Sequence, residues 1–114
     1  MSTISTHVLD TALGRPAAGV RVILEQVDDA GVGVSIGVGE TDADGRLRDL
    51  LPAGKTLAPG DYRLRFDTGA YFAASQRETF HPSVTVEFSV TGPAAHYHVP
   101  LLLSPYGYTT YRGS

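Results

Sequence analysis

The stretch HYHVPLLLSPYGYTTYRGS, residues 96–114, decides the fold and carries most of the residues that bear on function. Side chains alternate between the two faces of a β-strand, so the first half of this stretch divides into two sets. One face is apolar and is the expected core face: Tyr97, Val99, Leu101 and Leu103. His96 and His98 lie on the other face. The imidazole pair is therefore predicted on the more open side of the strand.

The second half of the stretch predicts a return strand. Ser104-Pro105-Tyr106-Gly107 has the composition of a turn and precedes an alternating run over residues 106–112. We expect a hairpin or a sharp corner, with Thr109 and Tyr111 on one face. Pro100 lacks a backbone N–H and favours an edge strand or a bulge over the centre of a sheet.

Most of the remaining chain shows the same period of two, in short runs separated by Gly, Pro and Asp. The alternation fails between residues 68 and 78, where the composition favours one short helix. We predict an all-β fold, a two-sheet antiparallel sandwich of about eight strands with one short helix, built from residues 1–114 as a single domain. The predicted strands are residues 4–11, 19–27, 32–41, 46–50, 60–67, 83–90, 96–103 and 106–112.

Composition excludes several functions. The net charge is −3 and the nine Lys and Arg residues are scattered, so no basic surface for nucleic acid is expected. The absence of cysteine excludes disulfides and a thiol nucleophile. No apolar run approaches the roughly 20 residues of a membrane span, and the first residues do not resemble a signal peptide. We therefore expect a cytoplasmic protein with no membrane partner.

Three histidines and one arginine are the candidates for chemistry. The alternation places His7, His96 and His98 on faces turned away from the core. Arg46 directly follows Asp42-Ala43-Asp44-Gly45, which we interpret as a hairpin turn because the further ligands of a calcium loop are missing. Residues of these types are often ordinary surface groups. Alternatively, three imidazoles could bind zinc and leave one coordination position open, although no carboxylate suggests itself as their partner.

Four segments resemble the transthyretin-related proteins, and more closely the 5-hydroxyisourate hydrolases of purine breakdown. They are THVLDTALGRPAAGV (6–20), DADGRLRDL (42–50), GDYRLRFDTGAYF (60–72) and the opening stretch (96–114). The resemblance covers nearly the whole chain. Its terminal Tyr-Arg-Gly-Ser is the mark that separates the hydrolases from the hormone-carrying transthyretins.

The resemblance implies a transthyretin-like sandwich that dimerises edge to edge and assembles into a homotetramer, with active sites in a central channel. It implies no metal or other cofactor. The catalytic residues that it implies are His7, Arg46 and His98. The substrate-binding residues that it implies are Tyr111, Arg112, Gly113 and Ser114, with His96 as a secondary candidate.

The implied reaction is hydrolysis of 5-hydroxyisourate to 2-oxo-4-hydroxy-4-carboxy-5-ureidoimidazoline during urate degradation. An imidazole, with a pKa near 6.5, suits both water activation and proton return. The guanidinium of Arg46 suits a developing oxyanion. The sequence leaves open whether His7 or His98 is the base. A small-ligand carrier on the same fold and a zinc-binding sandwich are the alternatives.

Overall fold

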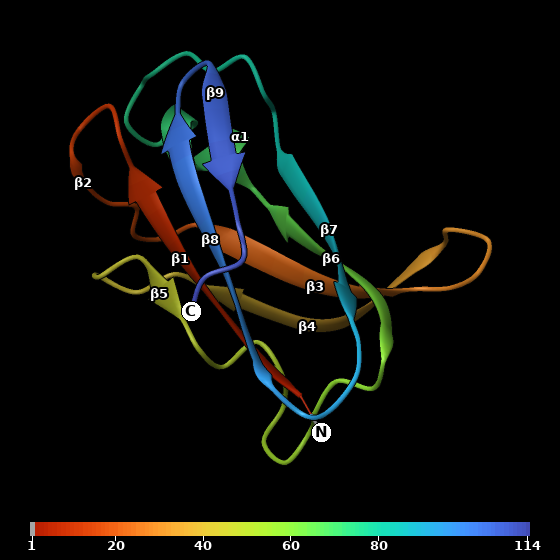
Figure 1. The fold of residues 1–114 in the computed structure, drawn as a ribbon. Coiled ribbons are helices and arrows are strands. Elements are labelled where there is room, and N and C mark those ends of the chain that lie inside the picture. The colour runs from red at the N-terminus through yellow and green to blue at the C-terminus, as the bar shows by residue number, and fades with distance from the viewer. Residues whose placement is uncertain (1) are drawn as a thin grey trace.

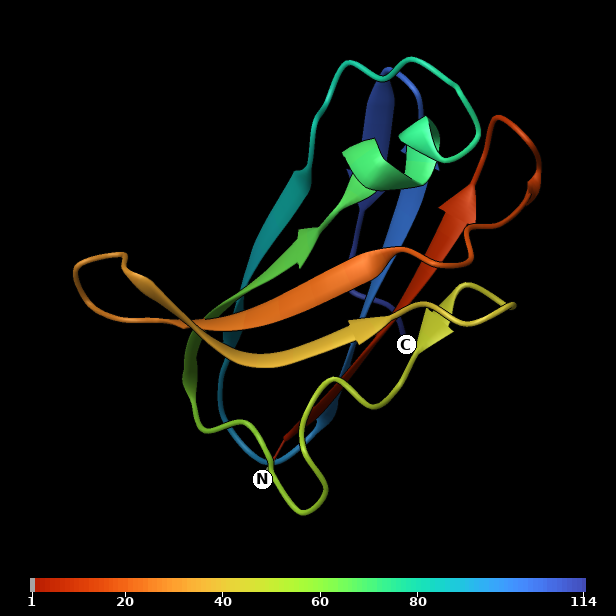
Figure 2. The same cartoon turned by 180° about the vertical axis from the view of Figure 1, so that it is seen from behind.

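Two β-sheets packed face to face form the protein (Figures 1 and 2). The computed structural model describes residues 2–114. The predicted fold class is confirmed, and the strand count within these residues is nine because the turn after β1 also contains the short strand β2. The elements are β1 (Thr3–Asp10), β2 (Arg15–Pro16), β3 (Arg21–Val27), β4 (Gly33–Glu40), β5 (Arg46–Leu47), β6 (Gly60–Phe66), α1 (Thr68–Ala73), β7 (Val84–Val90), β8 (His96–Ser104) and β9 (Gly107–Thr110).

The two sheets differ in how their strands pair. The four-stranded sheet has the order β4-β3-β6-β7 and is antiparallel throughout. The five-stranded sheet has the order β2-β1-β8-β9, and β5 also pairs with β1. Its β1–β8 pair is parallel, with Ser5 opposite His98, whereas the sequence predicted antiparallel pairing. A parallel pair needs a long connection, and here the connection contains most of the chain.

The core lies between the sheets and consists of the alternate positions predicted from the sequence. The predicted core residues of β8 are at most 6% exposed. The same holds for the inward positions of β1, β3 and β6: Ile4, Thr6, Val8, Val22, Leu24, Tyr62, Leu64 and Phe66. Period-two alternation therefore identified the buried face of each of these strands.

Two local predictions were wrong. Pro100 is not on an edge strand, because β8 lies between β1 and β9. The proline is nevertheless tolerated, since the β8–β9 ladder begins one residue later, at Leu101. The turn over residues 42–45 does not close a hairpin: β4 belongs to one sheet, and β5 pairs with β1 in the other.

Helix α1 is shorter than the predicted segment. It begins after Asp67, whose side chain accepts a hydrogen bond from the N–H of Ala70, and it is only six residues long. Gln76 has a φ of 54°, in the left-handed region, which is incompatible with continuing the helix. Among residues 2–114, no helix is long and apolar enough to cross a membrane.

A buried carboxylate ties the end of β1 to the segment after α1. Asp10 is fully buried, and its Oδ2 accepts hydrogen bonds from Arg77 at 2.7 Å and from the Tyr71 hydroxyl at 2.8 Å. Its Oδ1 accepts from the N–H of Leu13. Burial by itself would raise the pKa of Asp10, but these hydrogen bonds and the Arg77 charge outweigh it and hold the pKa below the usual value.

We expect Asp10→Asn to lower the free energy of unfolding by roughly 2–3 kcal/mol, because Arg77 would keep its charge without its buried partner. This is less than the roughly 3–5 kcal/mol of a fully buried pair, since the Arg77 side chain is 22% exposed. Urea denaturation measures this change. Glu87→Gln is the matched control: it breaks the exposed Arg63–Glu87 pair and should cost less than about 1 kcal/mol.

The same carboxylate predicts a pH dependence. Because the pKa of Asp10 is lower in the folded state, its contribution is present above the unfolded pKa near 3.9 and is lost as the pH falls through the folded value. The native protein should therefore lose more stability than Asp10→Asn below about pH 4. Equal losses for the two proteins would contradict this assignment.

Candidate functional site

The candidate residues gather on the outer face of the five-stranded sheet. His7 on β1 pairs with Arg46 on β5, so these two side chains are direct neighbours on one face. His98 on β8 is opposite Ser5 on β1. Because Ser5 is two residues before His7, His98 is a diagonal neighbour of His7. The structure thus brings the imidazoles that the sequence placed away from the core together with the guanidinium of Arg46.

The turn before β5 fixes the position of Arg46. The Asp42 carboxylate accepts hydrogen bonds from the N–H groups of Asp44 and Arg46, at 2.9 and 3.0 Å. Gly45 has a φ of 74°, and a Cβ at this position would lie 2.3 Å from the carbonyl oxygen of Val8. The turn is therefore held against β1 by a contact that only glycine allows.

The same turn fixes the tautomer of His7. Nε2 of His7 lies 2.9 Å from the carbonyl oxygen of Asp44. A carbonyl only accepts, so Nε2 carries the proton and donates. Nδ1 is then the one nitrogen of neutral His7 that can accept a proton or a hydrogen bond.

Ser5 joins the two histidines of β8. Its hydroxyl lies 2.8 Å from Nε2 of His96 and 2.8 Å from Nδ1 of His98. Nδ1 of His96 lies 2.6 Å from the hydroxyl of Thr3. Ser5 is buried, whereas His96 and Thr3 are exposed. The four groups form a continuous chain of hydrogen bonds from His98 to the surface.

His98 is poised in its neutral form. Partial burial lowers the pKa of His98 below 6.5, and the nearby His7, His96 and Arg46 lower it further because their positive charges disfavour a second cation. A neutral imidazole near pH 7 can accept a proton from water. The environment therefore suits His98 to a basic role.

The C-terminal segment returns across β8. The N–H of Gly113 donates to the carbonyl oxygen of His98 at 2.8 Å. A Cβ on Gly113 would lie 2.6 Å from Cδ2 of His98, so the glycine lies directly against the imidazole ring. The end of the chain thus covers one side of His98.

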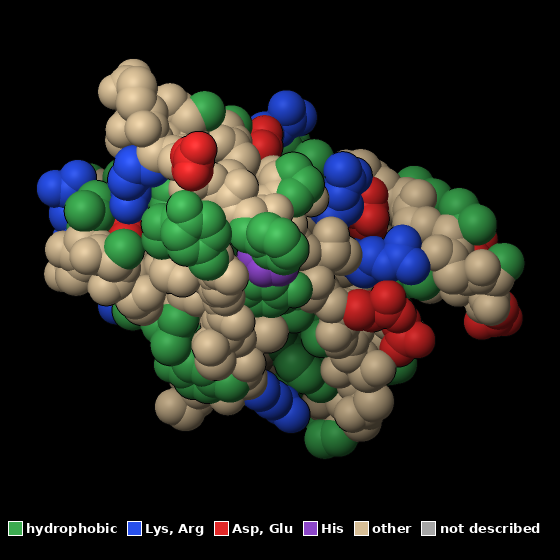
Figure 3. All heavy atoms as spheres, turned by 90° about the horizontal axis from the view of Figure 1, so that it is seen from above, with side chains coloured by type: hydrophobic (Ala, Val, Ile, Leu, Met, Phe, Trp, Pro, Cys, Tyr) green, Lys and Arg blue, Asp and Glu red, His purple; other side chains and the backbone are tan. Residues whose placement is uncertain are grey.

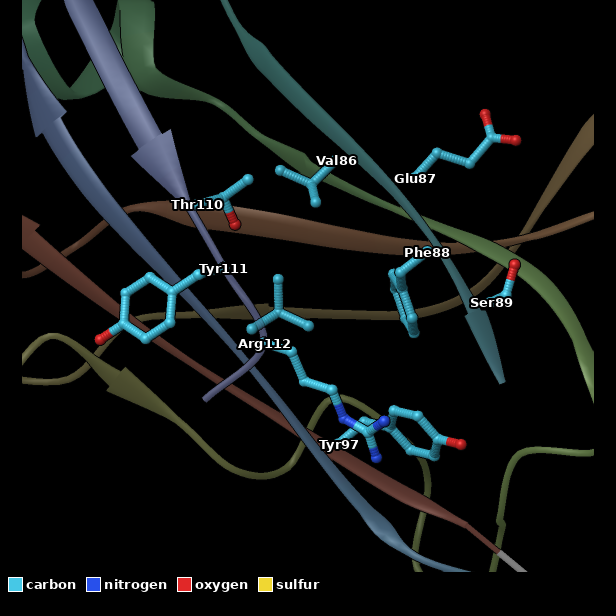
Figure 4. Close-up of a pocket in the computed structure, with 9 residues that line it drawn as sticks. Val86, Glu87, Phe88, Ser89, Tyr97, Thr110, Tyr111 and Arg112 are labelled. Carbon is cyan, nitrogen blue, oxygen red and sulfur yellow. The ribbon is translucent and has the colours of Figure 1, made fainter. Parts of the chain in front are cut away.

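Other residues of this segment point elsewhere. The Arg112 guanidinium lies over the ring of Tyr97, 4.5 Å from its centroid, whereas Tyr111 points away from that ring (Figure 4). Both line a cavity of about 240 Å³ between β7 and the C-terminal segment. Tyr97 belongs to the core face of β8, so Arg112 lies on the opposite side of this strand from His98.

The structure therefore joins His7, Arg46, His96, His98 and Gly113 within one subunit, but not Arg112 with them. Sequence reasoning missed three contributors: the hydroxyls of Ser5 and Thr3 and the carbonyl of Asp44. The alternation along β1 does place Thr3 and Ser5 on the face of His7. Only the parallel register brings those hydroxyls beside the histidines of β8.

One subunit does not provide a set of side chains that could bind a metal ion, within the part of the chain that the structure describes. Among the described residues, no group of three or more His, Cys, Asp or Glu side chains could hold a metal ion. The zinc alternative would thus need ligands from outside this chain.

Comparison with known proteins identifies the family. The model of the HIUase/transthyretin family matches residues 4–113. The chain belongs to this family. It is 52% identical to the 5-hydroxyisourate hydrolase of Salmonella dublin over 111 residues, which cover 97% of this chain and 80% of that protein.

Two solved structures show how the family fold is shared. The 5-hydroxyisourate hydrolase of Klebsiella pneumoniae is 38% identical, with a TM-score of 0.87 and full coverage of both chains. Sea bream transthyretin, solved in complex with thyroxine, is 33% identical, with a TM-score of 0.89 over 97% of this chain and 94% of that one. The family fold therefore occurs in both a hydrolase and a thyroxine-binding protein.

We predict that His98 titrates below pH 6.5, because its partial burial and its cationic neighbours disfavour the imidazolium. Arg46→Ala should raise the pKa of His98 by removing one of those positive charges. NMR titration of the ring nitrogens measures both values. Arg48→Ala is the control: it makes the same change at an exposed position two residues away and should leave the pKa of His98 unchanged. A native pKa at or above 6.5 would contradict the proposed environment.

Proposed function

We propose that this protein is a 5-hydroxyisourate hydrolase, which opens the cyclic amide of 5-hydroxyisourate during urate degradation. The observation that carries the proposal is the grouping of two imidazoles and a guanidinium, His7, His98 and Arg46, on one open face of the sheet. The identity to the Salmonella hydrolase supports it. The product would be 2-oxo-4-hydroxy-4-carboxy-5-ureidoimidazoline.

Each residue of the group has a distinct proposed role. His98, neutral near pH 7, accepts a proton from the attacking water. Arg46 is always charged and stabilises the oxyanion that develops on the attacked carbonyl. His7, whose Nε2–H is held by the Asp44 carbonyl, presents Nδ1 as an acceptor that orients the water or a polar group of the substrate. Of the C-terminal segment, Gly113 lies against His98 and would contact substrate together with Ser114, whereas Tyr111 and Arg112 line a separate cavity in one subunit.

A carrier function is the second candidate, since sea bream transthyretin binds thyroxine on the same fold. A carrier needs shape and apolar surface but no acid–base groups. The hydrogen bonds that fix the tautomer of His7 and orient the ring of His98 suit proton transfer better than simple binding. Neither His7 nor His98 lines the cavity beside Arg112.

We also propose a homotetramer located in the cytoplasm. In one subunit the His7–Arg46–His98 face is an open sheet surface, and a second copy is needed to enclose substrate and exclude water. Edge strands β7 and β9 have unpaired outer sides, which favour association. Apolar side chains also gather on the face seen in Figure 3. The exposed rings of Phe80 and Tyr108 both pack edge-on against the ring of His81.

The proposed reaction can be tested with urate and urate oxidase, which generate 5-hydroxyisourate in place. Added protein should accelerate decay of the absorbance of this intermediate. His7→Ala, Arg46→Ala and His98→Ala should each reduce kcat/KM by at least about 10²-fold, as expected for loss of an acid–base or electrostatic group. Arg48→Ala should retain activity. Decay no faster than in buffer would refute the hydrolase function, and a near-native variant would remove its residue from the site.

The assembly has its own test. Light scattering at working concentration should give the mass of four chains, and dilution that dissociates the assembly should reduce specific activity in parallel. An active monomer would contradict the proposed enclosure. Cell fractionation would check the cytoplasmic location.

A further inference from the structure

We propose that Ser5 and His96 form a proton relay that connects His98 to solvent and lets His98 alternate between base and acid. The proposal rests on the proposed hydrolase function and adds two positioning residues to it. It is carried by the chain of contacts from His98 through Ser5 and His96 to Thr3, with separations of 2.8, 2.8 and 2.6 Å.

The Ser5 hydroxyl couples the two rings because it holds a single proton. When it donates to one imidazole nitrogen, it must accept from the other. In one arrangement, Nδ1–H of His98 donates to Ser5, Ser5 donates to Nε2 of His96, and Nδ1–H of His96 donates to Thr3. In the other arrangement, every donor and acceptor is reversed. The tautomers of His96 and His98 therefore change together.

The two arrangements give His98 opposite reactivity. In the first, Nε2 of His98 has a free lone pair and can accept a proton. In the second, Nε2 carries a hydrogen and can donate it. Conversion between them moves protons along the chain and leaves each group uncharged. One imidazole can then serve both steps of a hydrolysis.

In the first step, water attacks the amide and His98 takes up its proton. Water oxygen bonds to the amide carbon, one water O–H bond breaks, and that proton binds Nε2 of His98. Nδ1–H of His98 passes its proton to Ser5, the Ser5 hydroxyl passes its own to His96, and His96 releases one through Thr3 to solvent. The negative charge remains on the carbonyl oxygen, beside Arg46.

The second step reverses the relay. As the C–N bond breaks, Nε2–H of His98 protonates the departing ring nitrogen. Solvent returns one proton through Thr3 to His96, His96 passes one to Ser5, and Ser5 restores Nδ1–H of His98. No net proton is gained or lost by the protein.

The surroundings of His98 favour this route. Its charged or titratable neighbours are His96 on its own strand, His7 on β1 and Arg46 on β5. The C-terminal segment places Gly113 against the ring. Three potential cations make a lasting imidazolium at His98 costly, so a path that exports the proton is useful. His7 cannot provide that path, because its Nε2–H is held by a carbonyl.

The test compares Ser5→Ala, Ser5→Thr and His96→Ala in the urate oxidase assay. Ser5→Ala should reduce kcat by about 10²-fold and leave KM within about twofold, because the relay acts on chemistry rather than on binding. Ser5→Thr keeps the hydroxyl and should recover most of kcat. His96→Ala should show a similar loss that imidazole in the buffer restores, since His96 is exposed. Ser104→Ala, which removes a hydroxyl at the other end of β8, is the control and should be unaffected.

The outcomes separate the relay from the proposed function. A kcat for Ser5→Ala within about twofold of native, or a loss in His96→Ala that imidazole does not restore, would overturn the relay. If the native protein does not hydrolyse 5-hydroxyisourate, the proposed function is wrong. The relay is then tested independently by ring ¹⁵N NMR. Protonation of His96 should change the tautomer of His98 in native protein but not in Ser5→Ala. Independent titration of the two rings in native protein would also overturn it.

Discussion

The parallel register of β1 and β8 is the constraint on which the rest of the site depends. It places Thr3 opposite His96 and Ser5 opposite His98, so that two hydroxyls of one strand meet two imidazoles of the next. A shift by one residue would turn the whole set to the other face of the sheet. The register is secured from the core side, because Ile4, Thr6 and Val8 are buried together with the alternate residues of β8.

Backbone groups complete the arrangement of the reactive side chains. The Asp44 carbonyl selects the tautomer of His7, and the Gly113 N–H binds the backbone of His98 while its missing side chain leaves space for the ring. Such contacts orient side chains at little entropic cost, since turns and strands are already ordered. The turn and the C-terminal segment therefore hold His7 and His98 in place.

The family shows that one sandwich supports different functions. Sea bream transthyretin binds thyroxine, and the Klebsiella protein is a hydrolase, yet both superpose closely on this chain. The fold supplies a rigid sheet, and the function depends on side chains carried by its outer face. In this chain that face carries hydrogen-bonded imidazoles beside a guanidinium, which favours hydrolysis over ligand transport.

The sequence by itself determined most of the strands, their buried faces and the outward direction of His7 and His98, because period-two alternation depends only on the geometry of a single strand. The resemblance added the family. Only the tertiary structure decided which strands are neighbours: the parallel β1–β8 pair, the passage from β4 to β5 between sheets, and the separation of Arg112 from His98. These features depend on contacts between residues as far apart as Ser5 and His98, whose register no local pattern encodes.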